Sequence, residues 1–167
     1  SLFVKKTFLE KGFSENKLIH IPYGVDLSQF KQIPKNDNVF RVVFAGGMTL
    51  QKGVHYLLQA FSELKLHNSE LLLIGSINDE IKPFFKKFMS LQNVNIKYIG
   101  HTPQIELYKY YSQGSVFVLN SIQEGLAMVQ LQAMACGLPV ICTINTGGED
   151  IVRDNKDGFI IPIRNVE

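Results

Sequence analysis

The chain has 167 residues, of which 46% are hydrophobic and 19% are charged, and its formal net charge is +2. A chain of this size buries enough surface to fold as one domain without a disulfide or a metal. The near-neutral charge, with no block of like charges, excludes a nucleic-acid-binding arm and a polybasic membrane patch.

The first thirty residues differ from the remainder of the chain. Residues 4–11 are predicted to form a helix and residues 17–21 a short strand, after which Pro22-Tyr23-Gly24 interrupts regular structure. The polar stretch 31–38 is predicted to be a linker or an exposed loop. Because the chain begins with Ser1 rather than Met, we expect it to be a piece of a longer protein.

From residue 39 onward, short β-rich runs alternate with helical patterns, which is typical of an α/β fold with a parallel sheet. Strands are predicted at 39–45, 71–74, 95–99, 115–119, 139–143 and 158–161. Helices are predicted at 54–64, 81–91, 102–112, 125–135 and 149–153.

Two of these helices carry local signals. Phe84, Phe85 and Phe88 are expected to face inward from the second predicted helix. Thr102 is expected to cap the third, with Pro103 in its first turn.

The two cysteines, Cys136 and Cys142, are too few for a disulfide scaffold. We expect both to be buried free thiols in a reducing compartment, which predicts a cytoplasmic protein. The longest apolar runs, 71–74 and 115–119, are far shorter than the roughly 20 residues that span a bilayer. No signal peptide opens the chain.

Ligands of an open parallel sheet bind beyond the carboxyl ends of its strands, at the starts of the following helices. This rule selects the loops at 46–53, 75–76, 100–102, 120–125 and 145–148.

Lys52 stands at the start of a predicted helix, where the helix dipole disfavours a cation. A lysine in that place suggests an anion nearby, such as a phosphate, although a solvated surface lysine explains it equally simply. The loop is neither a P-loop nor a G-x-G-x-x-G turn.

Glu124 lies where a strand ends and a helix starts, so it either complements the helix dipole or accepts hydroxyl groups of a ligand. The backbone N–H groups of Gly125, Leu126 and Ala127 are expected to meet a phosphate beside it. Gln132 is eight positions further on, so on a helix it lies toward a similar side to Glu124.

Of the four histidines, His101 alone follows a strand end in a predicted ligand loop. No Ser-His-Asp or Cys-His set and no metal-ligand spacing is present in the sequence, so no metal is expected.

The run E-G-L-A-M-V-Q-L-Q-A-M-A-C-G-L-P-V-I, at 124–141, closely resembles the donor-site segment of glycosyltransferase family 4, the "glycosyl transferases group 1". I-P-Y-G-V-D at 21–26 resembles the hinge segment of that family, and 44–53 resembles its phosphate loop. T-G-G-E-D-I-V-R-D-N-K-D-G-F-I-I at 146–161 matches a later landmark. The resemblance covers nearly the whole chain, and the ordered set is specific.

The resemblance implies the GT-B architecture, in which two Rossmann-like domains face each other across a cleft. Such enzymes transfer a sugar from a nucleotide-sugar to an acceptor hydroxyl with retention of configuration, and they need no metal or other cofactor. This chain resembles the C-terminal half, with 1–30 as interdomain hinge segment and 31–167 as the Rossmann-like donor-binding domain.

The implied enzyme is a hexosyltransferase-type glycosyltransferase of glycan or glycolipid synthesis, using a UDP- or GDP-linked sugar. Its partners are the nucleotide-sugar donor and its own N-terminal acceptor domain, which is missing here. Peripheral membrane association is possible through that missing half. The isolated fragment is expected to be inactive.

The resemblance assigns catalytic roles to two residues: Lys52 would hold the donor diphosphate, and Glu124 would bind the donor sugar. Gln132 would face the ribose hydroxyls. The other implied donor-binding residues are Gly46, Gly47, Gly100, His101, Ser121, Gly125, Leu126 and Ala127, with Gly100 and His101 at the nucleobase.

Two departures from the family pattern keep other functions open. Gln132 replaces a glutamate, and Gly47 replaces an arginine that often binds phosphate. The alternative is a non-catalytic nucleotide-binding Rossmann-like module. A flavodoxin-like signalling domain would carry an acidic cluster at its strand ends, and this sequence has none after Phe44 or Ile74. A GT-B sugar-nucleotide epimerase should show a different carboxylate pattern.

Overall fold

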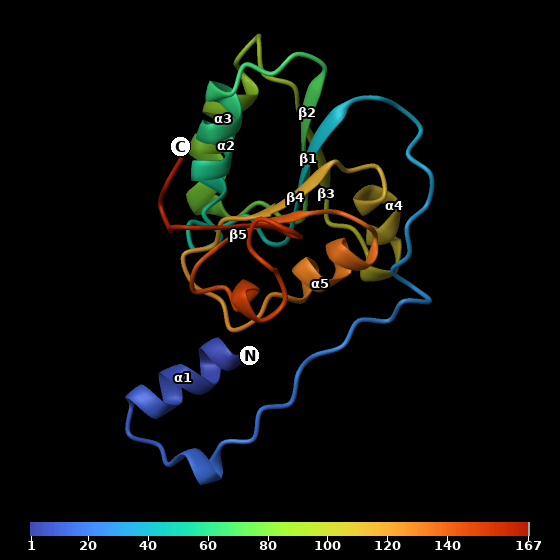
Figure 1. The fold of residues 1–167 in the computed structure, drawn as a ribbon. Coiled ribbons are helices and arrows are strands. Elements are labelled where there is room, and N and C mark those ends of the chain that lie inside the picture. Colours follow the sequence, from blue (N-terminus) through green and yellow to red (C-terminus); the bar gives the residue numbers. More distant parts are fainter. Residues whose placement is uncertain (167) are drawn as a thin grey trace.

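The computed structural model describes residues 1–166 and has a single six-stranded sheet at its centre (Figure 1). The strand order is β3-β2-β1-β4-β5-β6, and every neighbouring pair is parallel. The strands are β1 (Phe40–Ala45), β2 (Ser69–Ile74), β3 (Ile96–Gly100), β4 (Val116–Leu119), β5 (Val140–Thr143) and β6 (Gly158–Ile161).

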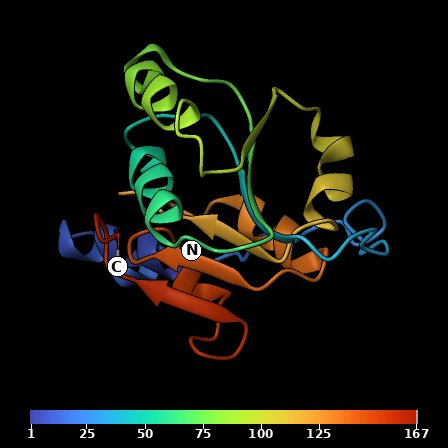
Figure 2. The ribbon, with the colours of Figure 1, turned by 90° about the horizontal axis from the view of Figure 1, so that it is seen from above.

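Helices cover both faces of the sheet. Figures 1 and 2 show α2 and α3 on one face and α4 and α5 on the other. The α-helices are α1 (Leu2–Glu10), α2 (Val54–Glu63), α3 (Lys82–Met89), α4 (Leu107–Tyr111) and α5 (Met128–Ala135). Four short 3-10 helices are η1 (Glu15–Lys17), η2 (Asp79–Ile81), η3 (Gln104–Glu106) and η4 (Gly148–Asp150). The predicted class, an α/β Rossmann-like parallel sheet with helices on both faces, is confirmed.

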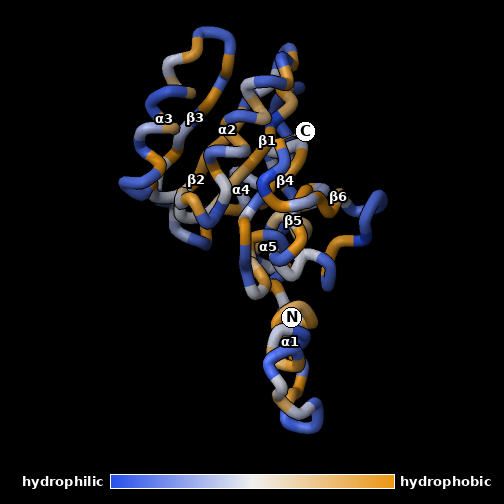
Figure 3. The backbone as a smooth tube through the Cα atoms, turned by 90° about the vertical axis from the view of Figure 1, so that its left-hand side faces the viewer, coloured by the Kyte–Doolittle hydropathy of each residue, from blue (hydrophilic) through white to orange (hydrophobic). Residues whose placement is uncertain are grey.

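The central strands carry apolar runs because the middle of a parallel sheet is buried on both faces. Val43 and Phe44 of β1, and Leu71 and Leu73 of β2, are fully buried. Figure 3 shows the hydrophobic stretches following the strands, with hydrophilic residues in the connections. The core therefore lies on either side of β1, β2 and β4.

The strand order reverses between β1 and β4. The chain leaves β1 toward β2 and leaves β4 toward β5, so the two connections diverge from neighbouring strands. In sheets of this kind, the point of divergence marks the ligand-binding crevice, which lies beyond the carboxyl ends of the two strands, here β1 and β4.

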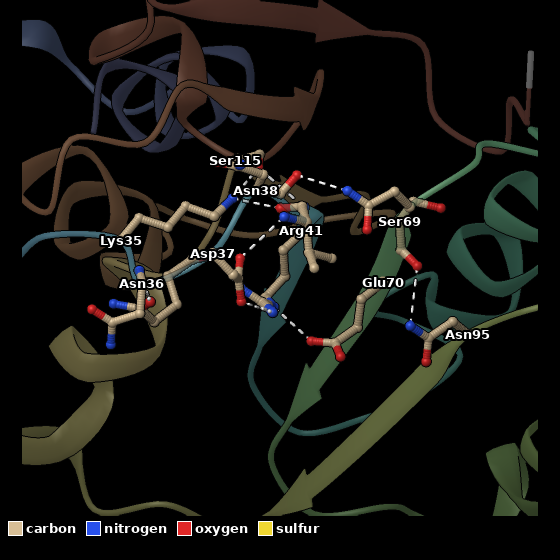
Figure 4. Close-up of polar contacts among 12 residues, drawn as sticks. Lys35, Asn36, Asp37, Asn38, Arg41, Ser69, Glu70, Asn95 and Ser115 are labelled. Carbon is tan, nitrogen blue, oxygen red and sulfur yellow. Dashed lines mark hydrogen bonds and ion pairs between the residues drawn. The ribbon is translucent and has the colours of Figure 1, made fainter.

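At the opposite end of the sheet, the stretch 31–38 is tied down by polar contacts (Figure 4). Lys35 Nζ donates to Ser115 Oγ at 2.8 Å. Arg41, which is 8% exposed, donates to Asp37 at 3.0 Å and to Glu70 at 2.5 Å. The Arg41 guanidinium lowers the pKa of the Asp37 carboxyl, chiefly by this hydrogen bond. The predicted linker is thus fastened to the amino ends of the strands.

Four sequence predictions about helices are wrong in detail. The helix expected at 125–135 begins only at Met128, and that at 149–153 is the 3-10 turn η4. Pro103 has extended backbone (φ −55°, ψ 140°) and itself precedes η3, so Thr102 is not the cap. Phe84 is 38% exposed, because α3 packs on the sheet and on α2 with only one side.

The strand expected at 17–21 is absent. This stretch starts in η1 and continues as extended chain without a neighbouring strand among the described residues. A strand needs a partner for its backbone hydrogen bonds, so β-favouring residues alone do not make one. Together with α1, it lies apart from the sheet (Figures 1 and 3).

Candidate functional site

Lys52 and Glu124 meet beyond the carboxyl ends of β1 and β4. Lys52 lies in the connection from β1 to α2, and Glu124 in the connection from β4 to α5. Lys52 Nζ donates to Glu124 Oε1, and the side chains are 26% and 15% exposed. The fold therefore joins two residues 72 positions apart into one partly buried ion pair.

The β1–α2 connection is held rigidly against the end of β4. Gly53 caps α2 with a left-handed backbone (φ 66°), and its carbonyl accepts a hydrogen bond from Asn120 Nδ2 at 2.5 Å. A Cβ at Gly53 would lie 2.2 Å from the Asn120 carbonyl oxygen, so only glycine fits. This contact fixes Lys52, the preceding residue, relative to β4.

The loop that carries Glu124 is supported from both sides. Ile122 N donates to Gln51 O at 2.8 Å, and Glu124 N donates to Asn145 O at 2.7 Å. Ser121 is fully buried, so its side chain contacts no ligand in this conformation, but its carbonyl accepts from the Thr143 hydroxyl. The loops after β1, β4 and β5 therefore meet at Glu124.

The turn from Gly125 to Ala127 leads into α5. Within residues 1–166, the backbone N–H groups of Gly125, Leu126 and Ala127 donate no hydrogen bond. Such groups before a helix form a natural anion-binding surface, because the positive end of the helix dipole adds to their partial charges. This surface lies directly beside the Lys52–Glu124 pair.

Gln132 does not share a helix face with Glu124, because α5 starts four residues after Glu124. The interpretation that assumed a continuous helix is wrong on this point. Gln132 is 3% exposed, and its Oε1 atom is buried without a hydrogen-bond partner among the described residues. Its carbonyl oxygen is therefore an unused acceptor within α5.

Three glycines bring the ends of β1, β2 and β3 together. Gly46 N donates to Ile74 O at 2.9 Å, and Gly75 N donates to Gly100 O at 2.8 Å. Gly47 is exposed, with nothing within 4 Å of a Cβ placed there. His101 is also exposed. Since β3 lies two strands from β1, His101 lies about 10 Å to the side of β1.

A cavity of about 370 Å³ opens between the ends of β1 and β2, lined by Gly47, Thr49 and residues 76–79. Sequence reasoning selected Gly75 and Ser76 but assigned no role to residues 77–79. It also missed the supporting roles of Gln51, Asn120 and Asn145. Of these, Asn145 carried a weak signal, because asparagine tolerates the left-handed backbone (φ 69°) it adopts here.

The remaining chemistry is sparse. Among the described residues, no three His, Cys, Asp or Glu side chains gather as a metal site would require. Cys136 and Cys142 are buried free thiols, as predicted, and burial raises the pKa of each to about 11. No helix in the described part of the chain has the length and apolar character to cross a membrane.

Residues 26–167 match the family described as "Glycosyl transferases group 1". The chain belongs to this family. It is 35% identical over 129 residues to the capsular polysaccharide biosynthesis glycosyltransferase CapM of Staphylococcus aureus, covering 75% of this chain and 33% of CapM. It is 31% identical over 129 residues to spore coat protein SA of Bacillus subtilis, covering 72% of this chain and 34% of that protein.

Solved structures share the fold. A glycosyltransferase from Rickettsia africae superposes with a TM-score of 0.84 at 24% identity, covering all of this chain and 49% of that one. Anabaena HepE in complex with UDP and glucose superposes with a TM-score of 0.82 at 20% identity, covering 96% of this chain and 47% of HepE. The C-terminal domain of the group 1 protein LpcC from Francisella tularensis superposes with a TM-score of 0.72 at 22% identity, covering 86% of this chain and 82% of that domain. The chain spans a third to a half of the curated relatives it matches.

Proposed function

We propose that the chain is the donor-binding half of a retaining glycosyltransferase, of the family 4 type, that moves a sugar from a UDP- or GDP-linked donor to an acceptor hydroxyl. One observation carries the proposal. Lys52, Glu124 and three unpaired N–H groups gather at the crevice where the strand order reverses. HepE, which shares the fold, was solved with UDP and glucose.

The proposed diphosphate site consists of Lys52 and the N–H groups of residues 125–127. All of these groups are hydrogen-bond donors with positive or partially positive charge, which suits a diphosphate at the start of α5. In the free protein Lys52 is held by Glu124, so we expect the diphosphate to take over part of this contact. Gly46 and Gly47 belong to the same β1–α2 connection as Lys52. Because they carry no side chain, their backbone is proposed to be accessible to the ligand.

Glu124 is proposed to accept hydroxyl groups of the donor sugar. Its partly buried carboxylate is aimed into the crevice by Lys52 and by the backbone contact to Asn145. Transfer breaks the bond between the sugar C1 and the phosphate oxygen and forms a bond from C1 to the acceptor oxygen. The departing phosphate oxygen takes the acceptor proton, and Lys52 and the N–H groups stabilise its charge by preorganised electrostatics.

The nucleoside is proposed to lie along the ends of β1, β2 and β3. Gly100 and His101 would face the nucleobase, and the free acceptor of Gln132 would serve a ribose hydroxyl after a small movement. No metal is expected, since Lys52 and the turn supply the positive charge. Which nucleotide is preferred is the first question for experiment.

A companion acceptor domain is proposed to complete the site, with 1–30 as the connection to it. Ile19 and Ile21 are 87% and 77% exposed in a segment whose backbone lacks strand partners. Such apolar chain is normally covered. Closure of the two domains would exclude water and prevent hydrolysis of the donor. The isolated chain should therefore bind nucleotide weakly and catalyse little.

Ligand-observed NMR of this chain with UDP, GDP and ADP tests the proposal. The Lys52→Ala variant should lose selective binding, whereas Lys109→Ala, an exposed lysine of α4 paired with Glu106 at 4.0 Å, should keep it. Glu124→Ala should lose the distinction between a nucleotide-sugar and its nucleotide. Equal binding by Lys52→Ala and the parent chain would refute the proposed site.

Gly47 and Gln132 favour the alternative of a non-catalytic nucleotide-binding module. Gly47 stands in place of a positively charged arginine, and Gln132 stands in place of a negatively charged glutamate. It predicts nucleotide binding without any contribution of Glu124 to sugar recognition. The Glu124→Ala measurement separates the two functions.

A further inference from the structure

The amino end of α1 contacts the rim of the candidate site. Ser1 Oγ donates to Gly125 O, and Leu2 N donates to Asp150 Oδ2 at 2.6 Å. A Cβ at Gly125 would lie 3.2 Å from Val4 Cγ2. Gly125 is the first residue of the turn whose free N–H groups form the anion-binding surface, and Asp150 closes η4 beside it.

The remainder of α1 is loosely attached. None of its residues is buried, and a cavity of about 580 Å³ separates one side of α1, from Leu2 to Glu10, from residues 144–145 and 149–150. Beyond η1, residues 19–25 donate no backbone hydrogen bond within the described chain. The contact of α1 with the domain is therefore concentrated at its first turn (Figure 1).

The bond from Leu2 N to Asp150 is the strongest part of this contact. A carboxylate that accepts an N–H of the first helical turn satisfies an orphan donor and lies at the positive end of the helix dipole. None of the residues of α1 is buried, so packing contributes little to its stability. The order of α1 should therefore depend on this bond.

We propose that Asp150 is a positioning residue that holds α1 against the turn at 125–127, so that the attachment of α1 and the binding of a diphosphate at that turn stabilise each other. The coupling to nucleotide rests on the proposed function, whereas the attachment itself does not. Because coupling is reciprocal, a nucleotide that binds the turn must also strengthen the attachment.

Two independent variants remove the bond. Asp150→Ala removes the acceptor, and Leu2→Pro removes the donor N–H at the first helical position, where proline is well tolerated. The matched controls are Leu2→Ala, which shortens the same side chain but keeps the N–H, and Glu149→Gln, which alters the exposed neighbour. Asp150→Asn keeps an acceptor oxygen and should restore most of the effect.

Hydrogen exchange of the α1 amides, in the nucleotide-free chain, is the first readout. Loss of a charge-assisted bond should speed exchange about tenfold in Asp150→Ala and in Leu2→Pro. The two controls should stay within about twofold. Unchanged exchange in both Asp150→Ala and Leu2→Pro would overturn the inference, whether or not the chain binds nucleotide.

The second readout is the coupling. UDP should slow exchange of the α1 amides in the parent chain, and Asp150→Ala should weaken UDP binding by about fivefold, within the usual range of coupling between sites. UDP binding that leaves α1 exchange unaltered would overturn the coupling. Failure of the parent chain to bind UDP would instead refute the proposed function, while the nucleotide-free exchange still decides the role of Asp150.

Discussion

Replacement of Gly53 by alanine should unlock the two loops that carry Lys52 and Glu124. Gly53 has φ 66°, and an added Cβ would lie 2.2 Å from the Asn120 carbonyl oxygen, so this oxygen must retreat to at least 3.0 Å. A left-handed alanine costs about 1–2 kcal/mol. Loosening the buried hydrogen bond from Asn120 Nδ2 to Gly53 O adds about 1–3 kcal/mol. We expect Gly53→Ala to lower the free energy of unfolding by about 2–5 kcal/mol in total.

Urea unfolding of a matched glycine series tests this magnitude. Gly100→Ala carries a positive φ (87°) with only the Tyr98 hydroxyl, at 3.9 Å, near the new Cβ. It should therefore cost only the backbone term of about 1–2 kcal/mol. Gly47→Ala has neither a positive φ nor a neighbour within 4 Å, and should change stability by less than about 1 kcal/mol. A Gly53→Ala cost no larger than that of Gly100→Ala would refute the steric reasoning.

Three further measurements follow from the charges and thiols of the structure. Glu124→Gln should raise the affinity for UDP a few-fold, because Lys52 loses its competing carboxylate; isothermal titration giving weaker binding would contradict this. The Arg153 hydrogen bond lowers the pKa of Asp157 to about 2, so the stabilising effect of this pair is present above the ordinary pKa near 4 and is lost as pH falls toward 2. NMR titration should return the Asp157 pKa toward 4 in Arg153→Ala, and an unchanged value would exclude that cause. Cys142, with a pKa near 11 and no exposed surface, should react with iodoacetamide at pH 8 only after unfolding.

The alternation of apolar runs and helical patterns was enough to predict all six strands of the sheet. The central strands are buried on both faces, so each contains an unbroken apolar run, such as residues 42–45 of β1 and 71–74 of β2. The segment 17–21 shows the limit of this reasoning. Its residues favour a strand, but strand formation depends on a neighbour that the local sequence does not contain.

The candidate site likewise contains residues that the sequence identifies and contacts that only the tertiary structure shows. The sequence identifies Lys52 and Glu124 as members of loops after strands, and Lys52 is the more informative of the two, because the helix dipole disfavours a cation at a helix start but favours an acidic residue there. The predicted common side of Glu124 and Gln132 loses its basis, because α5 begins at Met128 and Glu124 lies outside it. The contact of α1 with Asp150 had no sequence signal at all, since it joins residues 148 positions apart.

The sequence by itself determined the layers of this protein, through local patterns that depend only on which residues avoid water. It also determined which loops carry functional groups. Only the tertiary structure decided that Lys52 meets Glu124, that the turn at 125–127 keeps its N–H groups free, and that α1 rests on its rim. These features depend on contacts between distant segments. The reversal of strand order makes β1 and β4 neighbours, and this places the loop of Lys52 beside the loop of Glu124 and the turn at 125–127.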